Sequence, residues 1–217
     1  MIYLFDYDAG NLLSIERSLN FLNFDFLKIK KLDNISNKDI LLIPGVGSFE
    51  SASLRIKSAG LLKLANLDSK KRPFILGICL GMQLLMSYGY EGKKSEGLNL
   101  IKGSVESIFL RKPKELKIPK TIIGWEEFQI RNQFNDSYKW LNSYKNQSFY
   151  HVHSYMCVPK CPENIIATYS NQLSFIPNII GDFENKVLGF QFHPEKSGIK
   201  GLNLLKETLN LIAKINV

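Results

Sequence analysis

The stretch Phe74-Ile75-Leu76-Gly77-Ile78-Cys79-Leu80-Gly81 places a cysteine between two glycines at the end of an apolar run. The run predicts a buried strand, and the apolar residues from Leu80 to Met86 have helical spacing. A sharp turn between strand and helix leaves no room for flanking side chains, so it favours glycine on both sides and lifts the central side chain above the sheet. A helix N-terminus also favours a thiolate. We interpret Cys79 as a nucleophile, although a small core cysteine would fit the same letters.

The rest of the chain alternates in a way that predicts an α/β fold. Apolar runs at residues 2–7, 24–29, 40–43 and 74–78 read as strands, with a turn at Gly10-Asn11 and helical patterns after Leu12, Ser48 and Leu61. This order indicates a mainly parallel sheet. Short runs at 101–109, 122–130, 149–152, 165–169 and 187–190 predict an antiparallel extension in the second half, and residues 201–215 predict a closing helix.

Bulk composition narrows the class of protein. The chain has 217 residues and is 45% hydrophobic, which suits one domain over residues 1–217. No run approaches the roughly 18 to 20 apolar residues of a membrane span, and the first residues lack the features of a secretory signal. We therefore expect a cytoplasmic protein whose three cysteines are thiols. Cys157 and Cys161 have no second ligand pair beside them, so we expect no metal site.

The net charge of +8 raises the question of nucleic acid. The lysines are spread over several loops, no predicted helix carries a basic stripe, and no nucleic-acid motif is present. A solvated surface, a face for an acidic partner, or a field that attracts an anionic metabolite fits the pattern better. We predict no nucleic-acid partner.

A cysteine nucleophile needs a base, and the chain contains three histidines, His151, His153 and His193. His193 follows an apolar run and stands in His193-Pro194-Glu195. A carboxylate two residues away can reach the same imidazole, fix its tautomer and stabilise its charged form. A strand-end histidine beside a solvated glutamate is the plainer alternative. Together with the Cys79 turn, the pattern favours a Cys79, His193 and Glu195 triad.

These motifs resemble the class I (triad) glutamine amidotransferases, and within them most the glutaminase subunits of imidazole glycerol phosphate synthase. The similarity spans nearly the whole chain in the expected order. It rests on Asp6-Tyr7, Gly10-Asn11-Leu12, Pro44-Gly45-Val46-Gly47, Gly77-Ile78-Cys79-Leu80-Gly81-Met82-Gln83, Gly124-Trp125, His153-Ser154-Tyr155 and Phe190-Gln191-Phe192-His193-Pro194-Glu195-Lys196-Ser197. The resemblance implies a doubly wound, flavodoxin-like sheet and hydrolysis of glutamine to glutamate and ammonia without a cofactor.

The resemblance also implies roles for single residues. Cys79 attacks the glutamine amide, His193 moves protons and Glu195 orients His193. Amides of Val46 or Gly47 and of Leu80 form an oxyanion hole. Glutamine contacts are implied for Gln83, Glu91, Ser154 and Tyr155, all of which could instead be ordinary helix-end or strand residues.

Ammonia in this family passes to a separate (β/α)8-barrel cyclase, so the resemblance implies a heterodimer. Trp125 and Tyr150 are implied to contact that partner, although an aromatic pair in the core would look the same. Four positions depart from the expected pattern: Lys120, Glu126, His151 and Ser170, the first three near the implied partner face. They leave the partner open between the cyclase of histidine biosynthesis and an amidotransferase that makes acetamidino groups on bacterial surface sugars.

Two other classes of protein also remain open. A γ-glutamyl hydrolase or cysteine peptidase would share the turn around Cys79, although Gln83, Glu195 and His153-Ser154-Tyr155 argue for amidotransfer. A non-catalytic interaction subunit would have no reason to keep all three triad residues. Hydrolysis of glutamine rather than γ-glutamyl peptides would separate these possibilities.

Overall fold

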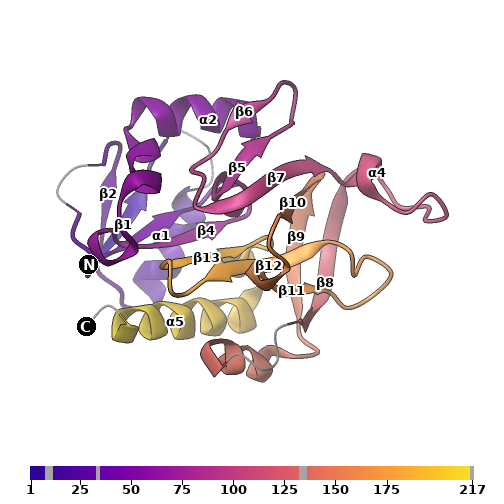
Figure 1. The fold of residues 1–217 in the computed structure, drawn as a ribbon. Coiled ribbons are helices and arrows are strands. Elements are labelled where there is room, and N and C mark those ends of the chain that lie inside the picture. The colour runs from indigo at the N-terminus through magenta and orange to yellow at the C-terminus, as the bar shows by residue number, and fades with distance from the viewer. Residues whose placement is uncertain (8–11, 33–34, 132–135, 216–217) are drawn as a thin grey trace.

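The computed structural model describes residues 1–7, 12–32, 35–131 and 136–215; the predicted turn at Gly10-Asn11 lies outside them. Within the described residues, nine strands form one sheet in the order β2-β1-β3-β4-β13-β12-β11-β8-β9 (Figure 1). These strands are β1 (Ile2–Phe5), β2 (Phe26–Ile29), β3 (Ile40–Ile43), β4 (Phe74–Ile78), β8 (Ile122–Ile130), β9 (Ser148–His153), β11 (Ile165–Tyr169), β12 (Pro177–Asp182) and β13 (Val187–Phe190). Antiparallel pairs join β13 to β12 and then run on through β11 and β8 to β9, as predicted.

The first half of this sheet is parallel and creates the edge on which the site is built. Strands β2-β1-β3-β4-β13 follow the flavodoxin-like order 2-1-3-4-5, and β4 is buried along its whole length. Ile43 pairs with Gly77, and Gly77 pairs with Gly189. The carboxyl ends of β3, β4 and β13 therefore lie side by side, where doubly wound sheets bind ligands.

The sequence predicted one helix over residues 80–86, but the structure ends this helix early and starts a strand of a second sheet there. The helix α3 (Leu80–Leu84) ends early, because the carbonyl oxygens of Leu84 and Met86 accept backbone hydrogen bonds from Leu98 and Asn99. Met86 starts strand β5 instead. The four strands of this sheet, in the order β10-β7-β5-β6, are β10 (Tyr155–Pro159), β7 (Ile101–Ser107), β5 (Met86–Gly89) and β6 (Ser95–Glu96).

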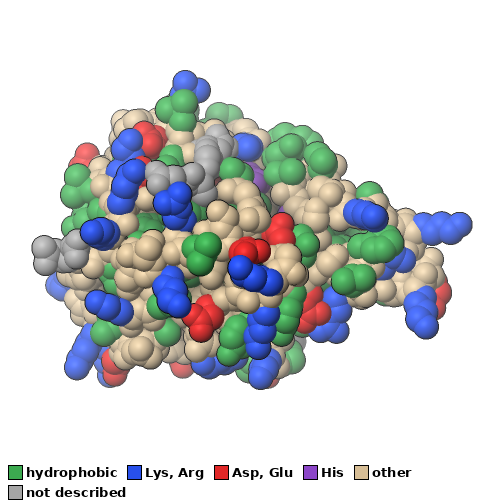
Figure 2. All heavy atoms as spheres, turned by 90° about the horizontal axis from the view of Figure 1, so that it is seen from above, with side chains coloured by type: hydrophobic (Ala, Val, Ile, Leu, Met, Phe, Trp, Pro, Cys, Tyr) green, Lys and Arg blue, Asp and Glu red, His purple; other side chains and the backbone are tan. Residues whose placement is uncertain are grey.

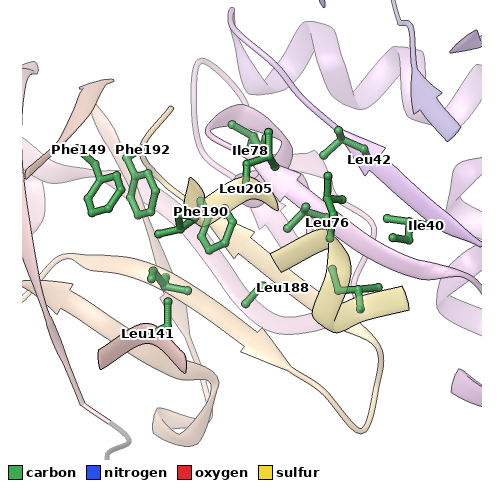
Figure 3. Packing of buried hydrophobic residues seen from close by; sticks show 14 of the residues in the cluster. Ile40, Leu42, Leu76, Ile78, Leu141, Phe149, Leu188, Phe190, Phe192 and Leu205 are labelled. Atoms are coloured by element: carbon green, nitrogen blue, oxygen red, sulfur yellow. The ribbon is translucent and has the colours of Figure 1, made fainter. Parts of the chain in front are cut away.

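Helices cover both faces of the main sheet. One face packs against α1 (Leu12–Phe21), the 3-10 segment η3 (Asp136–Tyr144) and α5 (Gly198–Ile215). There Leu205 belongs to the same buried cluster as Leu76 and Leu188, and a row of phenylalanines continues the core (Figure 3). The other face packs against α2 (Phe49–Ser58), α3 and η1 (Leu61–Asn66), which is a 3-10 turn rather than the predicted helix. Each buried Leu or Phe contributes about 1.5–3 kcal/mol.

The remaining elements of the described residues are short helical segments. They are η2 (Ser69–Lys71), α4 (Ile108–Arg111), η4 (Pro162–Asn164) and η5 (Pro194–Lys196). Lys and Arg side chains are dispersed over the face in Figure 2, with several on the segment around α4, which projects at the right of Figures 1 and 2. Among the described residues, no helix has both the length and the apolarity to cross a membrane.

Candidate active site

Cys79 occupies the tight turn between β4 and α3. Its backbone has φ +53° and ψ −108°, a conformation that non-glycine residues rarely adopt, and its amide donates to the Phe190 carbonyl oxygen at 2.7 Å. A Cβ added at Gly81 would lie 1.7 Å from the Ile43 carbonyl oxygen, and one at Gly77 would lie 2.5 Å from the Gly81 oxygen. Backbone packing therefore requires both glycines, and it holds Cys79 at the N-terminus of α3.

His193 and Glu195 form a buried pair after β13. His193 Nδ1 lies 2.7 Å from Glu195 Oε1, and the two side chains are 1% and 3% exposed. Burial alone would lower the pKa of His193, but the nearby Cys79 and then Glu195 raise it to about 10. Nε2, the other ring nitrogen, is buried and makes no hydrogen bond within the described part of the chain. The imidazole can therefore hold a proton and present it from Nε2.

The other two histidines are occupied elsewhere. His151 contacts the Asn178 Oδ1 at 2.9 Å, and His153 contacts the Tyr169 hydroxyl at 2.7 Å. Burial lowers the pKa of His151 to about 4 and that of His153 to about 3. Both are neutral at ordinary pH. His151, which we expected near the partner face, is fully buried: the strand register turns its side chain inward against Tyr169, so the side chain itself is not exposed there.

A cavity of about 280 Å³ opens above Cys79. Its lining contains the other seven residues that the sequence assigned to the oxyanion hole and to glutamine: Val46, Gly47, Leu80, Gln83, Glu91, Ser154 and Tyr155. Three lining residues were not predicted: Thr121, Val152 and His153. The pairing of β8 with β9 brings them there, and Thr121 Oγ1 lies 2.7 Å from Ser154 Oγ.

Glu91 and Gln83 are two polar residues of this lining. Glu91 Oε2 accepts a hydrogen bond of 2.6 Å from the Phe49 amide at the start of α2, where the helix dipole favours a carboxylate. Gln83 is buried and donates from Nε2 to the Tyr155 carbonyl oxygen at 3.2 Å and to Gln191 Oε1 at 3.3 Å. The cavity thus contains one carboxylate and one oriented amide.

The loop after β3 reaches the same cavity. Tyr7 donates from its hydroxyl to the Pro44 carbonyl oxygen at 2.6 Å, and a Cβ at Gly45 would meet that hydroxyl. Gly47 has φ +117°, which glycine adopts without steric cost. Leu80 donates its amide to the Gly45 carbonyl oxygen at 3.4 Å, so this loop presents an acceptor to Leu80.

Trp125 and Tyr150 form a pair at the end of the sheet. Their rings are 6.0 Å apart in an edge-to-face arrangement, and Trp125 is 56% exposed, so the pair is not part of the core. Tyr150 also accepts a hydrogen bond of 2.9 Å at its carbonyl oxygen from the His193 amide. The exposed pair is therefore connected to the buried histidine through one backbone contact.

One buried side chain beside Cys79 has no role in the sequence prediction. Gln191 Nε2 lies 3.8 Å from Cys79 Sγ, and Gln191 is fully buried. Its position two residues before His193 was a possible signal, because it places the glutamine at the same strand end. The contact itself depends on the register between β13 and β4.

Residues 8–210 match the family described as "Glutamine amidotransferase class-I". Two similar curated proteins are each called "Imidazole glycerol phosphate synthase subunit HisH". That of Exiguobacterium sibiricum is 35% identical over 207 residues, covering 95% of this chain and 93% of the relative. That of Lactococcus lactis subsp. lactis is 37% identical over 212 residues, covering 97% and 98%.

A solved structure supports the fold alone. "Structure of PurLQS from Thermotoga maritima" superposes with a TM-score of 0.68 at 17% identity, covering 96% of this chain and 97% of the other. The arrangement of parallel core and antiparallel strands is thus shared with a chain of very different sequence.

Proposed function

This chain belongs to the class-I glutamine amidotransferases, as a glutaminase subunit of the HisH type, and from that premise we propose that Cys79, His193 and Glu195 are its catalytic triad. The observation that carries the proposal is the buried His193–Glu195 pair of 2.7 Å, whose imidazole interacts with the strained Cys79, a residue that lines the cavity. Glu195 orients the imidazole and stabilises its charge.

The triad would act in two steps. The Cys79 sulfur attacks the side-chain carbonyl carbon of glutamine, and the resulting oxyanion forms beside the Leu80 amide and the loop at Val46 and Gly47. His193 gives its proton to the leaving nitrogen, the C–N bond breaks and ammonia departs. The raised pKa of His193 supports this role, because the imidazole carries the required proton. Water, deprotonated by His193, then attacks the thioester and releases glutamate and the thiolate.

We assign glutamine recognition to Gln83, Glu91, Ser154 and Tyr155. The support is their place around the cavity of about 280 Å³. Glu91 offers a carboxylate to the α-ammonium group of glutamine, and Gln83 offers an amide. A hydrogen bond between Thr121 and Ser154 would keep the Ser154 hydroxyl in place.

The partner would be the synthase subunit, a (β/α)8-barrel cyclase in a heterodimer, since the relatives are named as synthase subunits. Trp125 and Tyr150 are its proposed contacts, and the exposed face of Trp125 supports this assignment. We also propose a cytoplasmic location, which the three free cysteines favour.

The test compares two cysteine variants with the cognate cyclase present. Cys79→Ala should lose glutamine hydrolysis, while Cys161→Ala, which changes an exposed thiol, should keep it. With ammonium salts in place of glutamine, the complex containing Cys79→Ala should still support the cyclase reaction. Retained glutaminase activity in Cys79→Ala would disprove the triad.

A gene deletion tests the pathway. Histidine auxotrophy is expected. Growth without histidine, no complex with the cyclase and loss of amidino groups from surface glycans would point to the surface-sugar amidotransferase instead, with the triad unaffected.

A further inference from the structure

We propose that Gln191 is a further catalytic residue, which donates a side-chain N–H to the Cys79 sulfur and stabilises its thiolate. The inference rests on the proposed function of Cys79 but starts from an independent contact, Gln191 Nε2 to Cys79 Sγ at 3.8 Å. This distance is within the reach of a hydrogen bond to sulfur. Gln191 is fully buried, so bulk water does not compete for its amide.

The orientation of the Gln191 amide follows from a main-chain group that can only accept. Gln83 Nε2 is 3.2 Å from the Tyr155 carbonyl oxygen, which identifies that atom of Gln83 as the nitrogen. The same nitrogen lies 3.3 Å from Gln191, so the Gln191 atom facing it is the oxygen Oε1. The nitrogen of Gln191 must then face Cys79. Two linked amides therefore point a donor at the sulfur.

Main-chain hydrogen bonds fix the positions of Gln191 and Cys79. The main-chain N–H of Gln191 donates to the Asn178 carbonyl oxygen at 2.9 Å, and the main-chain N–H of Cys79 donates to the Phe190 carbonyl oxygen at 2.7 Å. The two side chains thus leave neighbouring strand ends that are fixed to each other. Rotation of the Gln191 side chain away from the sulfur would also break its bond to Gln83 and leave a buried oxygen without a donor.

The groups around the sulfur favour different protonation states. The Val152 carbonyl oxygen, 3.9 Å from Sγ, can accept only from the thiol. Gln191 Nε2 donates, and the His193 imidazolium with Glu195 behind it supplies positive charge, so both favour the thiolate. A donor to sulfur serves the reaction twice. It stabilises the thiolate before attack on glutamine, and it stabilises the electron pair that returns to sulfur when the C–S bond of the thioester breaks.

Alkylation of Cys79 by iodoacetamide across pH measures this contact directly. The full-length chain is used with Cys161→Ala, which removes the exposed thiol, and peptide mass mapping reports Cys79. Gln191→Leu keeps the size but removes the donor. We expect the pH midpoint of alkylation to rise by about one unit, which is about a tenfold lower rate below the midpoint. Gln83→Leu should shift it in the same direction by less.

Gln191→Glu is the isosteric variant for the case that Gln191→Leu does not fold. It places a carboxylate beside the sulfur, so the midpoint should rise at least as far. Gln129→Leu removes an exposed glutamine of β8 and should leave the titration unchanged. With the partner present, Gln191→Leu should lower kcat about tenfold or more with little change in KM.

Folded Gln191→Leu and Gln191→Glu proteins that titrate like the parent would overturn the proposal. The result is separable from the glutaminase proposal, because alkylation requires no turnover. A shifted midpoint in a chain that does not hydrolyse glutamine would support the contact and reject the reaction. An unshifted midpoint, together with loss of activity in Cys79→Ala, would reject the Gln191 contact and support the glutaminase reaction.

Discussion

The main-chain amide of Leu80 donates a 3.4 Å hydrogen bond to the carbonyl oxygen of Gly45. This amide is one of the two donors proposed for the oxyanion hole, and here it meets an acceptor. Rotation of the peptide unit between Gly45 and Val46 would replace the carbonyl oxygen with an N–H. Glycines on both sides of Val46 make such a rotation sterically inexpensive. In the structure, the loop therefore presents a carbonyl oxygen where the proposed oxyanion hole needs a second N–H.

We predict that the isolated chain hydrolyses glutamine slowly and that the cyclase subunit with its ligand bound accelerates it. One missing oxyanion donor costs about 10²–10³ in rate, so a stimulation of that order is expected. Steady-state glutaminase assays with and without the cyclase and its ligand measure it. Full-speed turnover by the isolated chain would contradict the prediction.

Loss of the base should be more damaging than loss of its orienting group. His193→Ala should be nearly as inactive as Cys79→Ala, because both remove a member of one reacting unit. Glu195→Gln keeps the shape but withdraws the carboxylate from His193 Nδ1, and a smaller loss of about 10²–10⁴ in kcat is expected. Single-turnover kinetics of the complex separate these cases. A loss in Glu195→Gln that equals or exceeds the loss in His193→Ala would contradict the assigned roles.

The His193 charge makes stability depend on pH in a defined direction. The pKa is raised from 6.5 to about 10 in the folded chain, chiefly by Cys79 and Glu195 against the effect of burial. The resulting stabilisation is fully present below about pH 6.5 and is lost as pH rises towards 10. We expect the stability difference between wild type and His193→Gln to shrink over that interval. Urea unfolding at several pH values measures it, and a constant difference would contradict the assignment.

The glycine after Cys79 should be intolerant of a single methyl group. Gly81→Ala would place Cβ against the Ile43 backbone, so the strand end must shift, at a cost of about 3 kcal/mol or more. Gly60→Ala is the control. The φ of Gly60 is +79°, but an added Cβ would meet no other group within 4 Å, so only backbone strain of about 1–2 kcal/mol is expected. Thermal unfolding distinguishes the two. Equal losses would show that contact with β3 is unimportant.

Trp125→Ala should weaken partner binding without harming the fold. The side chain is 56% exposed, so it contributes little to the core, while a buried aromatic anchor at an interface is worth about 2 kcal/mol or more, near 30-fold in Kd. Titration calorimetry with the cyclase measures this loss. Leu54→Ala, on the exposed side of α2, is the control and should bind normally. Equal affinity of both variants for the cyclase would rule out the Trp125 contact.

Local sequence patterns predicted the elements that depend on neighbours in the chain. Residues 122–130, 165–169 and 187–190 are strands with the predicted bounds, because apolar runs between turn residues bury well as strands. The turn at Cys79 was also predictable, since its two glycines exclude other residues for steric reasons. The prediction of a single helix over residues 80–86 was wrong, because backbone N–H groups of residues 98–101 bind the carbonyl oxygens of residues 84–86.

Sequence alone determined the parallel α/β core, the tight turn at Cys79, the His193–Glu195 pair and seven of the residues that line one cavity with Cys79. Tertiary structure decided which groups touch the sulfur and in which orientation. The Gln191 amide reaches Cys79 only through the β13–β4 register, and His151 turns inward only through β8–β9 pairing. Such contacts join residues more than a hundred positions apart or depend on rotamers in a packed interior. No periodicity along the chain encodes them, because they arise from how separate elements pair and pack.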